Sequence, residues 1–285
     1  MTPTVDGLVV VDKAAGWTSH DVVGKCRGIF HQKRIGHSGT LDPDATGVLL
    51  VGLGRVTRLL RFLTDLPKSY TGVVVLGVAT STLDASGEVV GEWDMSSATV
   101  ADVRAAAASL TGAILQVPPM VSAVKVGGRR LHELAREGVE VEREPRPVVV
   151  HRFDVHDPVG PGAFPIEVDC SSGTYVRTLA ADLGALLGGG AHLRDLRRTA
   201  IGSFSLADAR PIERVGLDSV LTPAAALRDY PAVDVDDETA ALVRNGRPLD
   251  LAPAGVAGPF RVLDPRGELL AVWEGAKPAV VLPSP

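Results

Sequence analysis

The stretch GHSGTLDPDATG at residues 36–47, followed directly by the apolar run VLLV at residues 48–51, decides how this chain is interpreted. It places a histidine, two carboxylates and several hydroxyl groups between closely spaced glycines. Because a buried strand fixes the loop beside it while the loop still reaches solvent, such loops often carry catalytic side chains. Asp-Pro and glycine are also ordinary turn residues, so a plain turn is the alternative. The stretch is therefore a candidate catalytic loop.

The longer segment GHSGTLDPDATGVLLVGLGRVTRLL, residues 36–60, resembles the signature GHxGxLDPxATGxL of the TruB family of tRNA pseudouridine synthases. The match includes His, Leu, Asp, Pro, Ala and Thr as well as the glycines, which makes it specific. The resemblance implies that Asp42 is the catalytic nucleophile. Asp44 falls on the unspecified position of the signature, and we interpret it as a turn residue.

Further segments resemble the same family in the same order along the chain. They are GLVVVDKAAGWTS at 7–19, KSY at 68–70, GVATSTLDASG at 77–87, PPMVSAVK at 118–125, CSSGTYVRTL at 170–179 and LRRTAIGSF at 196–204. Two positions depart from the family's pattern, with Ala14 in place of a proline and Val121 in place of a tyrosine. The second change removes an aromatic surface from the PPMVSAVK segment.

The resemblance implies roles for several other side chains. Arg177 is implied as the partner of Asp42, because its planar guanidinium can hold an ionised carboxylate bidentately in a site with little water. Tyr70 is implied as the third catalytic residue, stacking on the uracil, and His37 as the residue that fills the space left by a flipped nucleotide. The remaining candidates for binding substrate or RNA are Lys13, Thr80, Thr82, Lys125, Tyr175, Arg197 and Arg198.

The chemistry of pseudouridine formation explains these residue types. Uridine and pseudouridine are isomers, so the reaction needs no nicotinamide, nucleotide or metal, and the sequence lacks their binding motifs. We therefore expect no cofactor. A carboxylate can attack carbon or remove a ribose proton and then leave, and the sequence leaves the target atom of Asp42 open. The base must leave the RNA stack, at a cost of a few kcal/mol.

The composition bounds the kind of protein. With 285 residues and 45% hydrophobic content, the chain can form one large domain and a small one. The first six residues, MTPTVD, lack the basic start and long apolar run of a secretory signal, and no apolar run approaches the roughly 18 residues of a membrane span. Cys26 and Cys170 are isolated, which favours neither a zinc site nor a disulfide framework. We expect a cytoplasmic protein with no membrane contact.

The charge distribution is uneven. The net charge is −5, but the segment around the candidate loop is basic. Its basic residues are Lys25, Arg27, Lys33, Arg34, Arg55, Arg58 and Arg61, against only Asp42 and Asp44. Such a cluster is often solvated surface, and a cleft that binds RNA phosphates is the functional interpretation.

The hydrophobic pattern predicts an α+β fold, with a mixed and mainly antiparallel sheet. Predicted strands cover residues 7–11, 48–51, 69–78, 148–155 and 164–170, and predicted helices cover 18–30, 55–63, 101–110, 131–136 and 175–187. Residues 211–230 look like a linker. We expect a catalytic domain at residues 1–228, with an RNA-binding insertion around 120–150. A small β-rich domain of the RNA-binding PUA kind is expected at residues 229–285.

Other functions fit less well. The GHSG at 36–39 lacks the strand–turn–helix context of a serine hydrolase, SAVK at 122–125 lacks the accompanying β-lactamase motifs, and HELAR at 132–136 lacks the second zinc histidine. A non-catalytic RNA-binding protein or tRNA-folding chaperone stays as an alternative, as does a guide-RNA-dependent synthase of the dyskerin kind. We expect a monomeric enzyme without obligate protein partners. Its expected substrate is the T stem-loop of tRNA, and the resemblance implies uridine 55.

Overall fold

The computed structural model describes residues 4–282 except residues 123, 248, 254, 257 and 276, and the side chains of 125, 130, 132 and 136 are also outside the description. The chain forms two compact units. Unit 1 comprises Met1–Pro43, Gly47–Asp65 and Gly202–Pro285. Unit 2 comprises Asp44–Thr46 and Leu66–Ile201. Each unit is described below by itself.

The first sheet of unit 1 is built on two apolar strands. Its strands are β1 (Gly7–Lys13), β2 (Ile35–Ser38), β3 (Thr46–Leu53) and β14 (Arg210–Pro211). β1 runs antiparallel to β3, with Gly7 opposite Leu53 and Lys13 opposite Gly47, while β2 pairs antiparallel with β3 and β14 pairs parallel with β1. Every residue of β3 after Thr46 is buried, as expected for the run that follows the candidate loop.

Helix α1 (Ser19–Ile29) closes the core over this sheet. It begins with a capping box, in which the Thr18 hydroxyl accepts from the Asp21 amide and the Asp21 carboxylate accepts from the Thr18 amide. Its buried residues Val22, Val23 and Cys26 pack in one cluster with apolar residues of β1 and β3. The helix predicted for residues 18–30 is therefore confirmed.

Two local predictions in unit 1 are wrong. The single helix predicted for 55–63 is divided into a 3₁₀ helix η1 (Gly54–Arg58) and helix α2 (Leu60–Thr64). Residues 211–230 are no linker, because Ile212 and Val215 are buried in the core formed by β1, β3 and α1. This segment contains η2 (Ile212–Arg214), η3 (Leu217–Ser219) and α6 (Pro223–Ala226), and β13 (Phe204–Ser205) lies just before it.

The C-terminal part of unit 1 is a small β-rich domain, as predicted. Four strands lie in the order β15 (Ala232–Asp234), β16 (Phe260–Leu263), β17 (Leu269–Glu274) and β18 (Lys277–Val281). Helix α7 (Asp237–Arg244) packs on them through Ala240 and Val243, which share a buried cluster with Phe260 and Trp273.

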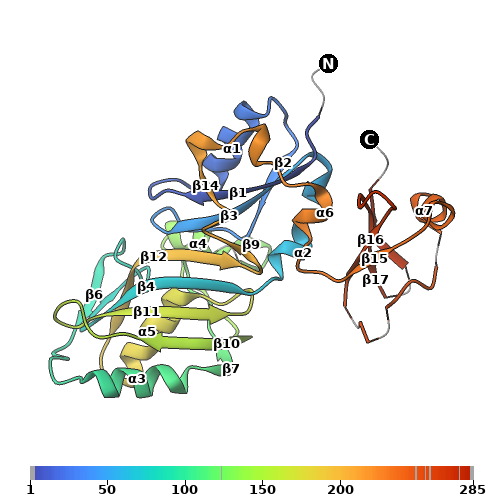
Figure 1. The fold of residues 1–285 in the computed structure, drawn as a ribbon. Coiled ribbons are helices and arrows are strands. Elements are labelled where there is room, and N and C mark those ends of the chain that lie inside the picture. Colours follow the sequence, from blue (N-terminus) through green and yellow to red (C-terminus); the bar gives the residue numbers. More distant parts are fainter. Residues whose placement is uncertain are drawn as a thin grey trace. The chain divides into compact units, whose positions relative to one another are not determined.

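Unit 2 is an antiparallel sheet with two helices packed on it (Figure 1). Its strands are β12 (Ala191–Ile201), β4 (Lys68–Leu76), β11 (Ala163–Cys170), β10 (Arg146–Val155) and β7 (Gly112–Gln116), in this order. The helices are α3 (Val100–Ser109) and α5 (Val176–Leu186). Smaller elements are the hairpins β5 (Val78–Thr80) with β6 (Val89–Glu92) and β8 (Lys125–Val126) with β9 (Arg129–Arg130), and helix α4 (Leu131–Arg136).

The predicted α+β fold with a mainly antiparallel sheet is confirmed. The pairing of β1 with β14 is parallel, whereas β4, β7, β10, β11 and β12 pair antiparallel with their neighbours in unit 2. In the described part of the chain, no helix combines the length and apolar character needed to cross a membrane.

Candidate active site

The loop that carries Asp42 is fixed on both sides of that residue. Before it, the amide of Leu41 donates to the Ser19 hydroxyl at 2.9 Å, and that hydroxyl lies 3.2 Å from the Leu41 carbonyl. After it, the carbonyl of Pro43 accepts from the Gly16 amide at 3.0 Å. Leu41 is buried and Asp42 is half-buried. The carboxylate therefore projects from a backbone that has two anchors within one residue of it.

Lys13 supplies a further anchor at the end of β1. Its side chain is 1% exposed, and its ammonium group donates to the carbonyls of Ala14 at 3.0 Å, Trp17 at 2.7 Å and Pro43 at 2.9 Å. A lysine has three N–H donors, so these bonds match its capacity and solvate the charge that burial would otherwise disfavour. The structure thus joins Lys13 to the Asp42 loop through the backbone.

His37 lies in β2 opposite Val51 of β3 and is half-buried. Its ring is in edge-to-face contact with His20 of α1, with centroids 5.6 Å apart and planes at 80°. His20 is exposed to solvent, whereas its contact partner His37 is part of a strand and half-buried. Sequence reasoning did not single out His20.

In unit 2, Arg177 is at the first turn of α5 and is 4% exposed. Its Nη1 donates to the carbonyl of Thr82 at 2.8 Å, and its Nη2 donates to the carbonyl of Val121 at 2.8 Å. Nη1 also lies 3.4 Å from Oδ2 of Asp84. These contacts hold the plane of the guanidinium group in one orientation.

Asp84, the carboxylate beside Arg177, also holds its own turn together through hydrogen bonds. Its Oδ1 accepts from the hydroxyls of Thr82 at 2.6 Å and Ser86 at 2.5 Å, and its carbonyl accepts from the Thr80 hydroxyl at 2.6 Å. The structure therefore brings Thr80, Thr82 and Arg177 together through Asp84. Asp84 lies within the GVATSTLDASG segment, but the sequence analysis assigned it no role.

A second overlooked residue, Gln116, fixes the start of α5. Its Oε1 accepts from the amide of Tyr175 at 2.8 Å, and its Nε2 donates to the carbonyl of Tyr175 at 3.1 Å. Gln116 is 2% exposed, and Tyr175 is the N-cap residue of α5. This clamp sets the position of the helix turn that carries Arg177.

The remaining candidates in unit 2 lie on the sheet. Tyr70 of β4 is opposite Val168 on one side and Arg198 on the other, and it packs against the buried core of the unit. Arg198 is 1% exposed, whereas the neighbouring Arg197 is half-buried. The side chain of Lys125 lies outside the described part of the structure. Among the described residues, no three His, Cys, Asp or Glu side chains form a metal-binding group.

Three arginines of the basic cluster in unit 1 make intramolecular ion pairs or hydrogen bonds. Arg55 forms an ion pair with Asp6 at 2.6 Å, Arg58 donates to the carbonyl of Val281 at 2.9 Å, and Arg61 lies 3.2 Å from Glu274. Arg58 and Arg61 are nevertheless exposed, as are Lys25, Arg27, Lys33 and Arg34, whereas Arg55 is half-buried. Most of the cluster therefore lies at the surface, with Arg55 and Arg61 each facing a carboxylate of the protein.

Family models match nearly the whole chain. Residues 27–176 match the model described as TruB family pseudouridylate synthase (N terminal domain). Residues 177–228 match the model of the tRNA pseudouridylate synthase B C-terminal domain, and residues 230–283 match that of tRNA pseudouridine synthase II, C terminal.

Individual proteins are similar over comparable lengths. The tRNA pseudouridine synthase B of Mycobacteroides abscessus is 48% identical over 273 residues, which cover 93% of this chain and 91% of that protein. The tRNA pseudouridine synthase B of Streptomyces griseus is 46% identical over 286 residues, which cover 97% of this chain and 95% of that protein. A solved Cbf5-Nop10-Gar1 complex contains a chain with a TM-score of 0.73 and 24% identity, covering 98% of this chain and 84% of that one. This last likeness shows the fold alone.

Proposed function

Because the chain belongs to the TruB family of pseudouridylate synthases, we propose that it isomerises uridine to pseudouridine in the T loop of tRNA, at position 55. The family indicated by the sequence motifs is thereby confirmed. The relatives named tRNA pseudouridine synthase B support tRNA as the substrate.

The observation that carries the proposal is the double anchoring of the Asp42 loop. A carboxylate that must attack the nucleotide, or remove a ribose proton, needs a fixed position, because small misplacements of a reacting group cost large factors in rate. Leu41 is hydrogen-bonded to Ser19, and Pro43 is hydrogen-bonded to Gly16. Lys13 adds a second hydrogen bond to the Pro43 carbonyl. These hydrogen bonds fix the backbone on both sides of Asp42 and so give its side chain a defined starting point.

We assign Arg177 and Tyr70 to the same reaction. Arg177 pairs with the ionised Asp42, and its guanidinium plane is suited to this because Thr82, Val121 and Asp84 orient it. Tyr70 stacks on the extruded uracil. Support for these two roles comes from the matching family segments KSY and CSSGTYVRTL.

Binding of the RNA is assigned to groups around these residues. His37 fills the space of the flipped nucleotide, and the half-buried Arg197 and the exposed Lys25, Lys33 and Arg34 contact phosphates. We propose that residues 1–228 carry the catalytic machinery and that residues 229–285 add RNA contacts. The enzyme acts as a monomer and needs no cofactor, guide RNA or protein partner.

The test uses the purified chain alone with unmodified tRNA transcribed in vitro, followed by mapping of pseudouridine at single-nucleotide resolution. We expect modification of uridine 55, and none in a transcript in which that uridine is replaced by cytidine. Tight tRNA binding without any pseudouridine would instead favour a non-catalytic RNA-binding protein or a guide-dependent enzyme. Modification at another uridine would contradict the assigned position while leaving the reaction intact.

A further inference from the structure

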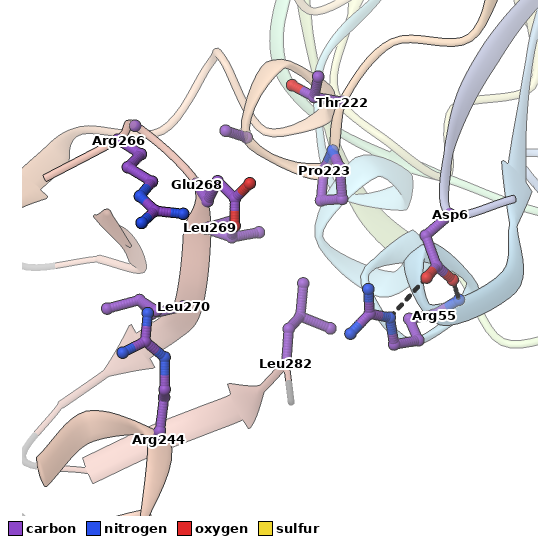
Figure 2. Close-up of a pocket in the computed structure, with 12 residues that line it drawn as sticks. Asp6, Arg55, Thr222, Pro223, Arg244, Arg266, Glu268, Leu269, Leu270 and Leu282 are labelled. Carbon is purple, nitrogen blue, oxygen red and sulfur yellow. Dashed lines mark hydrogen bonds and ion pairs between the residues drawn. The ribbon is translucent and has the colours of Figure 1, made fainter. Parts of the chain in front are cut away.

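Unit 1 contains a cavity of about 380 Å³ that none of the candidate catalytic residues lines (Figure 2). Its size is at the small end of the range for ligand pockets, about 300–1,000 Å³. Apolar walls come from Leu269, Leu270 and Leu282, all of which are at most 7% exposed. Charged groups from several elements surround this apolar surface, and Figure 2 shows the cavity residues Arg244, Arg266, Glu268, Asp6 and Arg55 as sticks.

One buried carboxylate positions two of the arginines. Asp264 is 5% exposed, and its Oδ1 accepts from the amides of Arg266 at 2.9 Å and Glu268 at 3.0 Å. Its Oδ2 accepts from Nη2 of Arg244 at 3.2 Å. The turn between β16 and β17 and the end of α7 are therefore joined at a single side chain, so Arg244 and Arg266 are placed at the cavity by the same group.

The two arginines retain hydrogen-bonding capacity. Within the described part of the chain, the Arg266 guanidinium forms no hydrogen bond or ion pair, and Arg244 bonds only to Asp264. A guanidinium group has five N–H donors and matches the geometry of phosphate oxygens. Arg55 differs, because its guanidinium is paired with Asp6 at 2.6 Å, which neutralises that part of the lining.

We propose that this cavity binds a nucleotide. Arg244 and Arg266 bind the phosphate, and the base packs on Leu269, Leu270 and Leu282. The Glu268 carboxylate, which likewise has no side-chain partner among the described residues, accepts from the amino group of the base. Adenine, cytosine and guanine carry such an amino group and uracil does not, so the site prefers these three over uracil.

The nucleotide has two sources, a free mononucleotide or an unpaired nucleotide of a bound RNA. The second source rests on the proposed function, since the RNA would be the tRNA substrate and its unpaired 3′ end the segment that reaches the cavity. The first source is independent of that function. Both sources use the same phosphate and base contacts.

The first experiment titrates the full chain with AMP, UMP, adenosine and inorganic phosphate in a calorimeter. It compares the wild type with Arg266→Gln, which removes a guanidinium that has no partner among the described residues, and with Arg247→Gln as the control. Arg247 is an exposed arginine close to α7 that does not line the cavity. For a free nucleotide, AMP should bind the wild type and Arg247→Gln alike, and about tenfold more weakly to Arg266→Gln.

UMP should bind more weakly than AMP, and neither adenosine nor phosphate alone should match AMP. Equal binding of AMP to Arg266→Gln and Arg247→Gln would overturn the proposal, as would phosphate binding as tightly as AMP.

The second experiment measures affinity for tRNA with and without its unpaired 3′ nucleotides. If the RNA supplies the nucleotide, free AMP shows no binding, but Arg266→Gln binds intact tRNA about tenfold more weakly than Arg247→Gln. This difference should vanish for the trimmed tRNA. The site is refuted if AMP does not bind and Arg266→Gln binds intact tRNA as tightly as Arg247→Gln. These readouts need no turnover, so an inactive enzyme would leave them interpretable.

Discussion

The Nζ of Lys13 donates a hydrogen bond to the carbonyl of Pro43 at 2.9 Å, so the end of β1 holds the residue that directly follows Asp42. This bond links two family segments that are 30 residues apart in sequence. Lys13 is buried and acts on the backbone. Lys13 therefore contributes to the proposed reaction by holding the loop that carries Asp42 in position.

Lys13→Met should therefore slow the reaction more than it weakens RNA binding. The substitution removes three hydrogen bonds to carbonyls and frees the loop, and a displacement near 1 Å can cost about 100-fold in rate. Single-turnover rates and tRNA dissociation constants measured side by side would show this. Lys33→Met removes an exposed lysine assigned to phosphate contact and should show the reverse, with weaker tRNA binding and a single-turnover rate at saturating tRNA like that of the wild type. Equal single-turnover rates for Lys13→Met and Lys33→Met would contradict the anchoring role.

Asp84→Asn should lower the rate through Arg177. The ion pair at 3.4 Å is lost, while the turn keeps an oxygen that can accept from Thr82 and Ser86. We expect the rate to fall about 10- to 100-fold, which corresponds to an activation free energy higher by about 1.4–2.7 kcal/mol because the Arg177 charge is less well placed. Asp94→Asn is a matched control, because Asp94 accepts from Ser96 in a similar turn without an arginine. If both variants retain full activity, Asp84 does not orient Arg177 for the reaction.

Gln116→Glu should destabilise unit 2 and also slow the reaction. A carboxylate cannot donate to the Tyr175 carbonyl, so one buried bond becomes a repulsion, which costs about 1–3 kcal/mol of unfolding free energy. Gln32 makes the same pair of bonds to the backbone of Val5 in unit 1. Gln32→Glu should lower the urea midpoint too, but its rate at a temperature where both variants are folded should match the wild type. If Gln32→Glu is also slowed, the loss of rate in Gln116→Glu comes from general destabilisation and not from the position of α5.

The two buried thiols should make the protein less stable in alkali. Burial raises the pKa of Cys26 and of Cys170 from 9.0 to about 11. The unfolded chain loses these protons first, so the stability that the neutral thiols contribute is complete below pH 9 and is lost as the pH rises towards 11. At pH 10 the loss should be about 1 kcal/mol per thiol.

The measurement is urea unfolding at pH 8 and pH 10 for the wild type and for Cys26→Ala/Cys170→Ala. Comparing the two proteins removes the contribution of other groups that titrate in alkali. The doubly substituted protein should lose less stability over this interval. An identical loss in both would show that the thiols do not titrate differently on folding.

The sequence predicted the features that depend on neighbouring residues. The Asp42 loop, the start of α1 at Thr18 and the strand β3 each follow from a short pattern of glycines, capping residues or apolar residues. The clamp between Gln116 and Tyr175 joins residues 59 apart, and nothing local to Gln116 marks it. The proline and polar content of residues 211–230 predicts a linker, which is wrong because Ile212 and Val215 are buried against residues of β1 that are distant in sequence.

Release of tritium from uracil C5 of labelled tRNA, measured for Asp42→Asn beside Asp44→Asn, tests the central claim most directly. The two substitutions make the same chemical change two residues apart, and Asp44 is exposed. We predict that Asp44→Asn releases tritium at the rate of the wild type, while Asp42→Asn binds tRNA with unchanged affinity and releases none. Tritium release by Asp42→Asn at the wild-type rate would contradict the assignment of this carboxylate as the catalytic group.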